Sequence, residues 1–184
     1  MKTLLDLYTQ CKAGDAKAQR ILYDLFKGRL MGLCRRYTRN REEAQDVLQE
    51  AFIKIFSNVD QLDAPEKLES WMKAIVVRTA ISAFHATKNK MLLFSTSERA
   101  EEQEDFQSLE SVSDAYLISL VNALPDGCRI VFNLFAIEGY SHAEIANMLS
   151  ISEGTSRSQL HHAKYLLKEK LKCQNLAHYY EKFA

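Results

Sequence analysis

The sequence of 184 residues is poor in glycine and proline, with 6 Gly and 2 Pro, which argues against a fold rich in turns and sheets. It has no run of about 18 apolar residues, so we expect no membrane-spanning helix. The first residues lack the long apolar stretch of an export signal, and the four cysteines are scattered without a CxxC pair. We therefore expect a cytoplasmic protein with reduced thiols.

Motifs for catalysis are also missing. The sequence has no evident nucleophile–base pair, glycine-rich phosphate loop or metal-ligand cluster. His161 and His162 are adjacent, and neighbouring side chains on a helix point about 100° apart, so the two are poorly placed to share one ion. We expect no enzymatic activity, no cofactor, no metal and no small-molecule substrate.

The charges balance overall but are segregated along the chain. There are 24 basic and 24 acidic residues, yet residues 98–114 contain seven acidic residues and a single arginine. Residues 1–97 carry a basic excess, and residues 115–184 are close to neutral. A protein that binds nucleic acid unaided is usually more basic, so DNA binding by this chain would need the help of a partner.

Apolar residues recur at helical spacing through most of the chain, and no stretch alternates with a period of two. This pattern predicts an all-α protein with two small helical domains joined by an acidic flexible linker. In residues 88–113 the periodicity fails, and we interpret the acidic part as a partly disordered linker, with a solvated acidic helix as the alternative. Pro125-Asp126-Gly127 is expected to form a turn. The expected helices cover residues 4–11, 16–37, 40–56, 68–84, 115–124, 129–138, 141–149 and 152–173.

The last two of these helices have the layout of a helix-turn-helix motif. Ser141 and Glu144 form a capping box, and a three-residue turn, Ser150 to Ser152, leads into a long helix. Small residues at its start would let the backbone approach a DNA groove, and arginine can pair with guanine or contact phosphate. A plain helical hairpin with solvated charges is the alternative. The candidate DNA contacts are Thr155, Ser156, Arg157, Ser158, His161, His162 and Lys164.

A row of acidic residues follows one side of the expected helix 40–56. Glu43, Asp46 and Glu50 recur at spacings of three and four, with Gln49 nearby, on the face opposite the apolar stripe. Like charges in a row cost a little stability. Either this face is simply solvated, or it docks on a basic partner surface.

Three segments together resemble the RNA polymerase sigma factors of the extracytoplasmic-function (ECF) subfamily of the sigma-70 family. They are residues 41–56 (REEAQDVLQEAFIKIF), residues 124–146 (LPDGCRIVFNLFAIEGYSHAEIA) and residues 151–160 (ISEGTSRSQL). The string from Glu153 to Leu160 is similar to a branch common in Bacteroidetes-type bacteria.

The resemblance implies a role for each part of the chain. Residues 1–90 would be the sigma-2 domain, which binds core RNA polymerase and the −10 element, with Glu43, Asp46, Gln49 and Glu50 on the beta-prime clamp. Residues 91–113 would be the linker in the RNA channel. Residues 114–173 would be the sigma-4 domain on the −35 element of promoter DNA and the beta flap. The tail 174–184 has no assigned role, and an anti-sigma factor is implied as a further partner.

The chain departs from the family pattern between Trp71 and Lys90. Arg78 stands where Asn is common, Ser82 where Asp is common, and His85-Ala86 where a basic pair is common. The candidate −10 contacts are Trp71, Lys73, Arg78, His85 and Lys88. This departure favours one alternative to a sigma factor that melts promoters, namely a sigma-like interaction module. A one-component helix-turn-helix regulator is a second alternative.

A second departure lies in the turn of the helix-turn-helix. Ser150 stands where the family usually has glycine, a change that would cost little stability if its backbone stays at negative φ.

Overall fold

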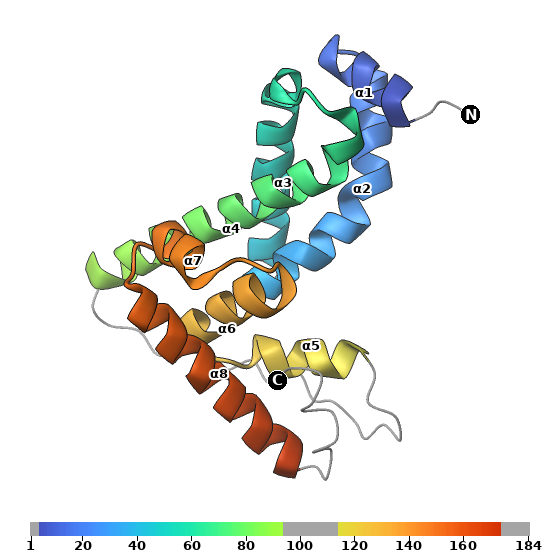
Figure 1. Cartoon of the computed structure of the whole chain (residues 1–184). Helices are drawn as coiled ribbons and strands as arrows, with labels where there is room; N and C mark the ends of the chain where they lie inside the picture. Colours follow the sequence, from blue (N-terminus) through green and yellow to red (C-terminus); the bar gives the residue numbers. More distant parts are fainter. Residues whose placement is uncertain (1–3, 94–113, 174–184) are drawn as a thin grey trace. The chain divides into compact units, whose positions relative to one another are not determined.

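The computed structural model describes residues 4–93 and 114–173, and every regular element in these ranges is a helix (Figure 1). This confirms the predicted all-α fold. The chain divides into two compact units, Met1–His85 and Ala86–Ala184. None of the described helices is both long and apolar enough to cross a membrane. Most of the predicted linker, residues 94–113, and the tail 174–184 lie outside the described residues.

Polar side chains cap the starts of two helices in the first unit. This unit contains α1 (Leu4–Lys12), α2 (Ala16–Tyr37), α3 (Arg41–Ser57), short 3-10 turns at Val59–Gln61 and Pro65–Lys67, and most of α4 (Leu68–Leu93), whose residues from Ala86 on are assigned to the second unit. Gly14 lies at φ +80° after α1, and the Asp15 carboxylate then accepts hydrogen bonds from the first backbone amides of α2. Asn40 caps α3 by accepting from the Glu43 amide at 2.8 Å.

The core of the first unit lies mainly between α2 and α3, which pack side by side (Figure 1). The stripe predicted on α3 is buried except for the half-buried Phe56 at its end. The Phe52 ring meets the Tyr23 ring of α2 at 4.7 Å between centroids. From α4, Leu68, Met72 and Val76 are fully buried, and each such side chain stabilises the unit by about 1.5–3 kcal/mol.

Helix α4 is longer than the sequence pattern predicts. It continues to Leu93 instead of ending near Phe84, so the start of the predicted linker lies within it. The reason is local: residues 85–93 contain no glycine or proline, and polar helix formers such as Lys88 and Lys90 extend a helix without an apolar stripe.

The second unit contains α5 (Asp114–Asn122), α6 (Asp126–Phe132), a π-helical turn η3 (Asn133–Ile137), α7 (His142–Leu149) and α8 (Glu153–Cys173). The turn predicted at 125–127 is wrong, because α6 already begins at Asp126 with Pro125 as its N-cap. The predicted helix 129–138 is also not uniform, since its second half is the π turn. Gly139, at φ +80°, ends it.

The inner side predicted for α8 is confirmed. Leu160, Ala163, Leu167 and Leu171 are buried and pack against α6 and α7. Arg129 of α6 is also buried, with 4% of its surface exposed. Its guanidinium donates to the Asp126 carboxylate at 3.0 Å and to the Asn122 carbonyl at 3.3 Å, which ties α5 to α6.

Candidate nucleic-acid interface

The two helices of the predicted helix-turn-helix are present, and α7 begins with the predicted capping box. The Glu144 amide donates to Ser141 Oγ at 3.3 Å, and the Ser141 amide donates to the Glu144 carboxylate at 2.8 Å. The hydrogen bond from the Ser141 hydroxyl, followed by the one from its backbone amide, holds the pKa of Glu144 below its usual range. The carboxylate form of Glu144 is therefore part of the helix start.

The turn between α7 and α8 has a left-handed backbone at Ser150, with φ 53° and ψ 46°. The negative φ under which serine would cost little is therefore not adopted at this position. The backbone amides of Ser150 and Ile151 both donate to the Ala146 carbonyl, the Ile151 bond measuring 3.0 Å, which closes the end of α7. Glycine adopts this conformation at little cost, whereas a serine Cβ is strained there.

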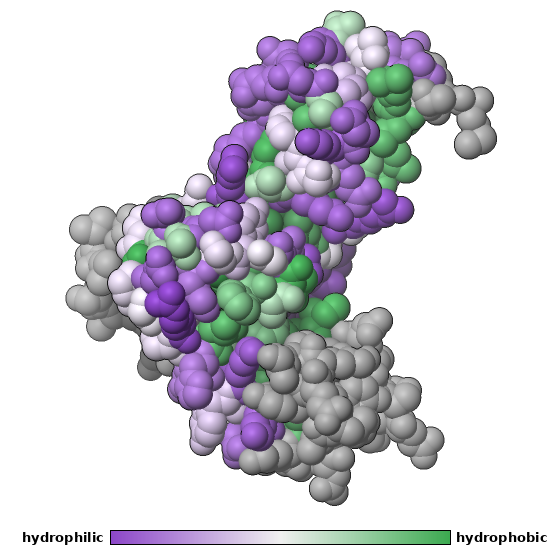
Figure 2. Space-filling model, in the orientation of Figure 1, coloured by the Kyte–Doolittle hydropathy of each residue, from purple (hydrophilic) through white to green (hydrophobic). Residues whose placement is uncertain are grey.

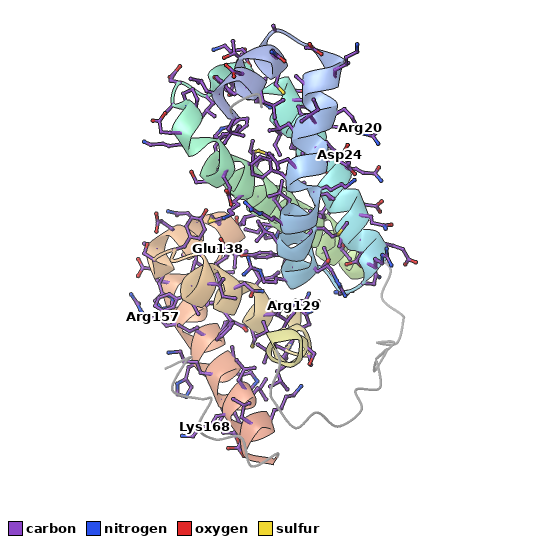
Figure 3. All side chains as sticks on the ribbon, turned by 90° about the vertical axis from the view of Figure 1, so that its right-hand side faces the viewer. Arg20, Asp24, Arg129, Glu138, Arg157 and Lys168 are labelled. Atoms are coloured by element: carbon purple, nitrogen blue, oxygen red, sulfur yellow. The ribbon has the colours of Figure 1, made fainter. Side chains whose placement is uncertain are left out.

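Helix α8 presents a polar surface over its first turns. Ser152 caps it by accepting from the Thr155 amide at 3.0 Å. Hydrophilic residues cover most of the side of α8 visible in Figure 2, and Figure 3 shows Arg157 near its amino end and Lys168 further along. Of the predicted contacts, Lys164 is half-buried. Those with exposed side chains are Thr155, Arg157, Ser158, His161 and His162.

The Arg157 guanidinium donates to the Glu153 carboxylate at 2.6 Å, and both side chains are exposed, at 61% and 46%. Exposed pairs of this kind contribute about 0–1 kcal/mol, so Arg157 is readily released toward another acceptor.

Ser156 does not lie where the sequence pattern placed it. Its side chain is fully buried, and Ser156 Oγ lies 2.9 Å from Nδ1 of His142 on α7. The side chain therefore faces the interior of the unit and is not available to DNA. Position 156 falls on the same helical row as Leu160 and Ala163, which the serine hydroxyl obscured in the sequence.

In the first unit, most of the predicted acidic row lies on the outer, solvent-exposed face of α3. Asp46, Gln49 and Glu50 are exposed, and the Glu50 carboxylate pairs with Lys54 Nζ at 2.6 Å. Glu43 is half-buried and is already used at the helix start, where it accepts from the Arg39 amide at 3.0 Å. The surface that a basic partner could reach is therefore formed mainly by the other three residues.

A hollow of about 280 Å³ lies between the end of α3, the following 3-10 turn and α4. It brings together Trp71 and Arg78, two of the predicted −10 contacts, but also side chains that we did not predict. Lys54, Asn58 and Gln61 recur at spacings of four and three along the end of α3 and the turn, a polar row that could have indicated them. Its lining is Lys54, Asn58, Gln61, Trp71, Ile75, Arg78, Thr79 and Ser82.

Lys73 and His85, two further predicted −10 contacts, do not line this hollow. Lys73 is exposed and pairs with Glu69 at 3.0 Å. His85 is half-buried beside the Phe84 ring, and its Nε2 is buried without a hydrogen-bond partner among the described residues. Lys88 belongs to α4, but its side chain lies outside the described residues.

The chain thus has two helical units, and the second contains a helix-turn-helix. This arrangement is typical of the class of DNA-binding transcription factors. Comparison with known families matches residues 22–90 to Sigma-70 region 2 and residues 114–167 to Sigma-70 region 4.

Relatives and a solved structure agree with these matches. The chain is 29% identical to the ECF RNA polymerase sigma factor SigW of Bacillus subtilis, over 89% of this chain and 94% of that protein. It is 25% identical to the ECF RNA polymerase sigma-E factor of Haemophilus influenzae, over 90% and 93% of the two. The fold is similar to that of the sigma factor RpoE from Bartonella quintana, solved with the anti-sigma factor NepR, with a TM-score of 0.56 and 19% identity over 83% of this chain and 96% of that one.

The two family matches cover the larger part of the chain and fall on the two units described above. The chain therefore belongs to the sigma-70 family, and its relatives are sigma factors of the ECF subfamily.

Proposed function

We propose that this protein is an alternative sigma factor that binds core RNA polymerase and directs it to promoters with −35 and −10 elements. The observation that carries the proposal is the capped helix α8, which presents Arg157 and Thr155 on its exposed side within the region 4 match. The protein would catalyse no reaction itself. It would supply sequence preference to the polymerase in the cytoplasm.

The −35 element would be read by the first turns of α8 in the major groove. Arg157 would exchange its exposed pair with Glu153 for two hydrogen bonds to guanine, a contact worth about 1–3 kcal/mol of base discrimination. Thr155, Ser158, His161, His162 and Lys164 would contact neighbouring bases or phosphates. We leave Ser156 out of this set because it is buried.

Core polymerase would be bound by the outer face of α3. Asp46, Gln49 and Glu50 are exposed together on this helix, whose other face is fixed in the core by Val47 and Ala51. Two carboxylates presented by a rigid helix suit a basic surface, which we propose to be the beta-prime clamp. The second unit would in addition contact the beta flap.

The −10 element would be opened by capture of an unstacked base in the hollow beside Trp71. The hollow offers a half-buried indole for stacking, and the side chains of Arg78 and Lys54 for the phosphate backbone. Stacking of a base on an aromatic side chain is worth about 1–3 kcal/mol. Lys73 and His85 would have at most a supporting role on the DNA strand, because they lie outside the hollow. Lys88 would contact the same strand on family resemblance.

Several finer assignments belong to the same proposal. The sigma-2 domain would cover residues 1–90, the linker 91–113, the sigma-4 domain 114–173 and the tail 174–184. On family resemblance we propose an anti-sigma factor as a further partner. The string from Glu153 to Leu160 supports a Bacteroidetes-like origin.

The proposal is tested by run-off transcription and core-polymerase pull-down with the same variants. Arg157→Ala is expected to lower −35-dependent transcription by about tenfold and to leave core binding unchanged. Arg157→Lys is the matched control, since it keeps the charge but not the bidentate geometry, and should relax the base preference while retaining most non-specific DNA affinity. Equal loss of transcription and core binding in Arg157→Ala would count against the assignment.

The same assays separate the two alternatives. A sigma-like interaction module would bind core polymerase without supporting initiation, as the altered helix after Trp71 would suggest. A one-component regulator would shift a promoter fragment in a gel without any polymerase.

A further inference from the structure

Three elements of the second unit meet at the side chain of His142. The Phe135 ring of the π turn stacks on the imidazole, with 4.6 Å between ring centroids and 21° between planes. At the edge of the same imidazole ring, Nδ1 lies 2.9 Å from Ser156 Oγ of α8. His142 is half-buried and is the first residue of α7, directly after the Ser141 cap. The π turn, α7 and α8 are thus joined through one side chain.

The contact to Ser156 differs in kind from the apolar contacts of α8 with the core. The same part of α8 makes one further hydrogen bond of this kind, which Cys128 Sγ of α6 donates to Gln159 Oε1 at 2.9 Å. Further along the same inner face, Leu160, Ala163 and Leu167 are buried by apolar packing, which is non-directional. A hydrogen bond constrains direction as well as distance. A fully buried hydroxyl without a hydrogen-bond partner would lower the stability of the fold, so this bond is kept in the folded state. With the Cys128–Gln159 bond one turn further on, this contact fixes the rotation of α8 about its own axis near its amino end.

The residues on either side of Ser156 are the ones whose direction matters for DNA. Thr155 and Arg157 are its chain neighbours, so each points about 100° away from the buried hydroxyl, on the exposed side of the helix. A small rotation of α8 at this point would move the Arg157 guanidinium away from base edges. Stacking by Phe135 holds the imidazole plane and so determines where Nδ1 points.

We propose that His142 is a positioning residue for promoter reading: through Ser156 it sets the rotation of α8, and thereby aims Thr155 and Arg157. The inference rests on the proposed function, because it concerns how α8 is presented to the −35 element. His142, Ser156 and Phe135 do not themselves touch DNA. His142 acts through Ser156, and Phe135 acts through His142.

The test uses two substitutions of His142 that differ by one methylene group. His142→Asn places a polar atom on Cγ, where Nδ1 stands, and can keep the bond to Ser156. His142→Gln moves the amide one bond further out, to the place of Nε2, and cannot keep it in the same geometry. Both lose the aromatic ring, so loss of the stack on Phe135 is common to the pair.

Each variant is assembled as full chain with core polymerase, and run-off transcription is measured on a promoter library randomised in the −35 element. Melting temperature and core binding are measured in parallel, and transcription is assayed well below the lowest melting temperature. We expect His142→Gln to lower the preference for the base read by Arg157 by about tenfold. His142→Asn should stay within about twofold of wild type, with core binding unchanged in both. Ser156→Ala should lower the preference as His142→Gln does, and combining the two should add little further loss.

The outcomes separate this inference from the function on which it rests. A wild-type preference that survives His142→Gln, or that falls equally in His142→Asn and His142→Gln, would overturn the positioning role and leave the proposed function in place. A wild-type holoenzyme without any −35 preference would overturn both.

Discussion

Replacing Ser150 with glycine should stabilise the protein. Ser150 lies in the left-handed region at φ 53° and is exposed, so its side chain gains little from packing in return for the strain. That conformation costs a non-glycine residue about 1–2 kcal/mol. Glycine removes this cost but gives back about 0.4–1 kcal/mol through the greater freedom of the unfolded chain. The net gain expected for Ser150→Gly is therefore about 0.5–1 kcal/mol, or a rise in Tm of about 4 °C.

The assay is thermal and urea unfolding of the full chain, followed by circular dichroism. Ser150→Ala is the matched control, because it removes the same hydroxyl but keeps the Cβ, and it should change stability by no more than about 0.5 kcal/mol. If Ser150→Gly were destabilising, or if it and Ser150→Ala changed stability equally, the argument from backbone strain would be refuted.

Three further predictions follow from the two units. Reversing two charges on α3, with Asp46→Arg and Glu50→Arg together, should abolish binding to core polymerase in a pull-down, because both carboxylates are exposed on the proposed docking face. Trp71→Ala should slow promoter opening, measured by permanganate reactivity, by about tenfold through loss of base stacking, while Trp71→Phe should retain most of it. Glu144→Gln should make the free energy of unfolding fall less steeply as the pH is lowered into the acid range. The lowered pKa of Glu144 stabilises the fold above its unfolded pKa, and this contribution is lost as pH falls through the folded pKa.

Controls for these variants come from the same chain. Asp60→Arg with Glu66→Arg makes the same charge change at two exposed positions away from the α3 face and should leave core binding intact. Promoter opening as fast in Trp71→Ala as in wild type would argue against the hollow as a base pocket. A Glu144→Gln protein whose stability fell as steeply in acid as wild type would show that the carboxylate does not contribute as its hydrogen bonds indicate.

The sequence predicted most reliably what depends on local patterns. The caps at Asn40 and Ser141, the apolar stripe of α3 and the inner row of α8 follow from residue type and spacing, and the structure contains all of them. The bounds of α2, Ala16–Tyr37, also agree with the prediction, because Gly14-Asp15 and the polar residues after Tyr37 mark its ends.

What could not be predicted depends on contacts between elements or on backbone geometry. A serine on an apolar row can be buried or exposed, and the burial of Ser156 beside His142 depends on how α7 and α8 pack together. The π turn after α6 has no local signal in its residues. The hollow beside Trp71 combines side chains from α3, the following turn and α4, so its lining depends on packing that the sequence pattern does not specify.

In the proposed function, this chain gives core RNA polymerase a promoter preference that the polymerase alone lacks. This is measured most directly by mapping the 5′ ends of transcripts made in vitro by purified core polymerase on genomic DNA of the source organism, with and without the chain. We expect a discrete set of start sites that appear with the chain and share two upstream elements at constant spacing. A pattern of start sites unchanged by adding the chain would refute the proposed function.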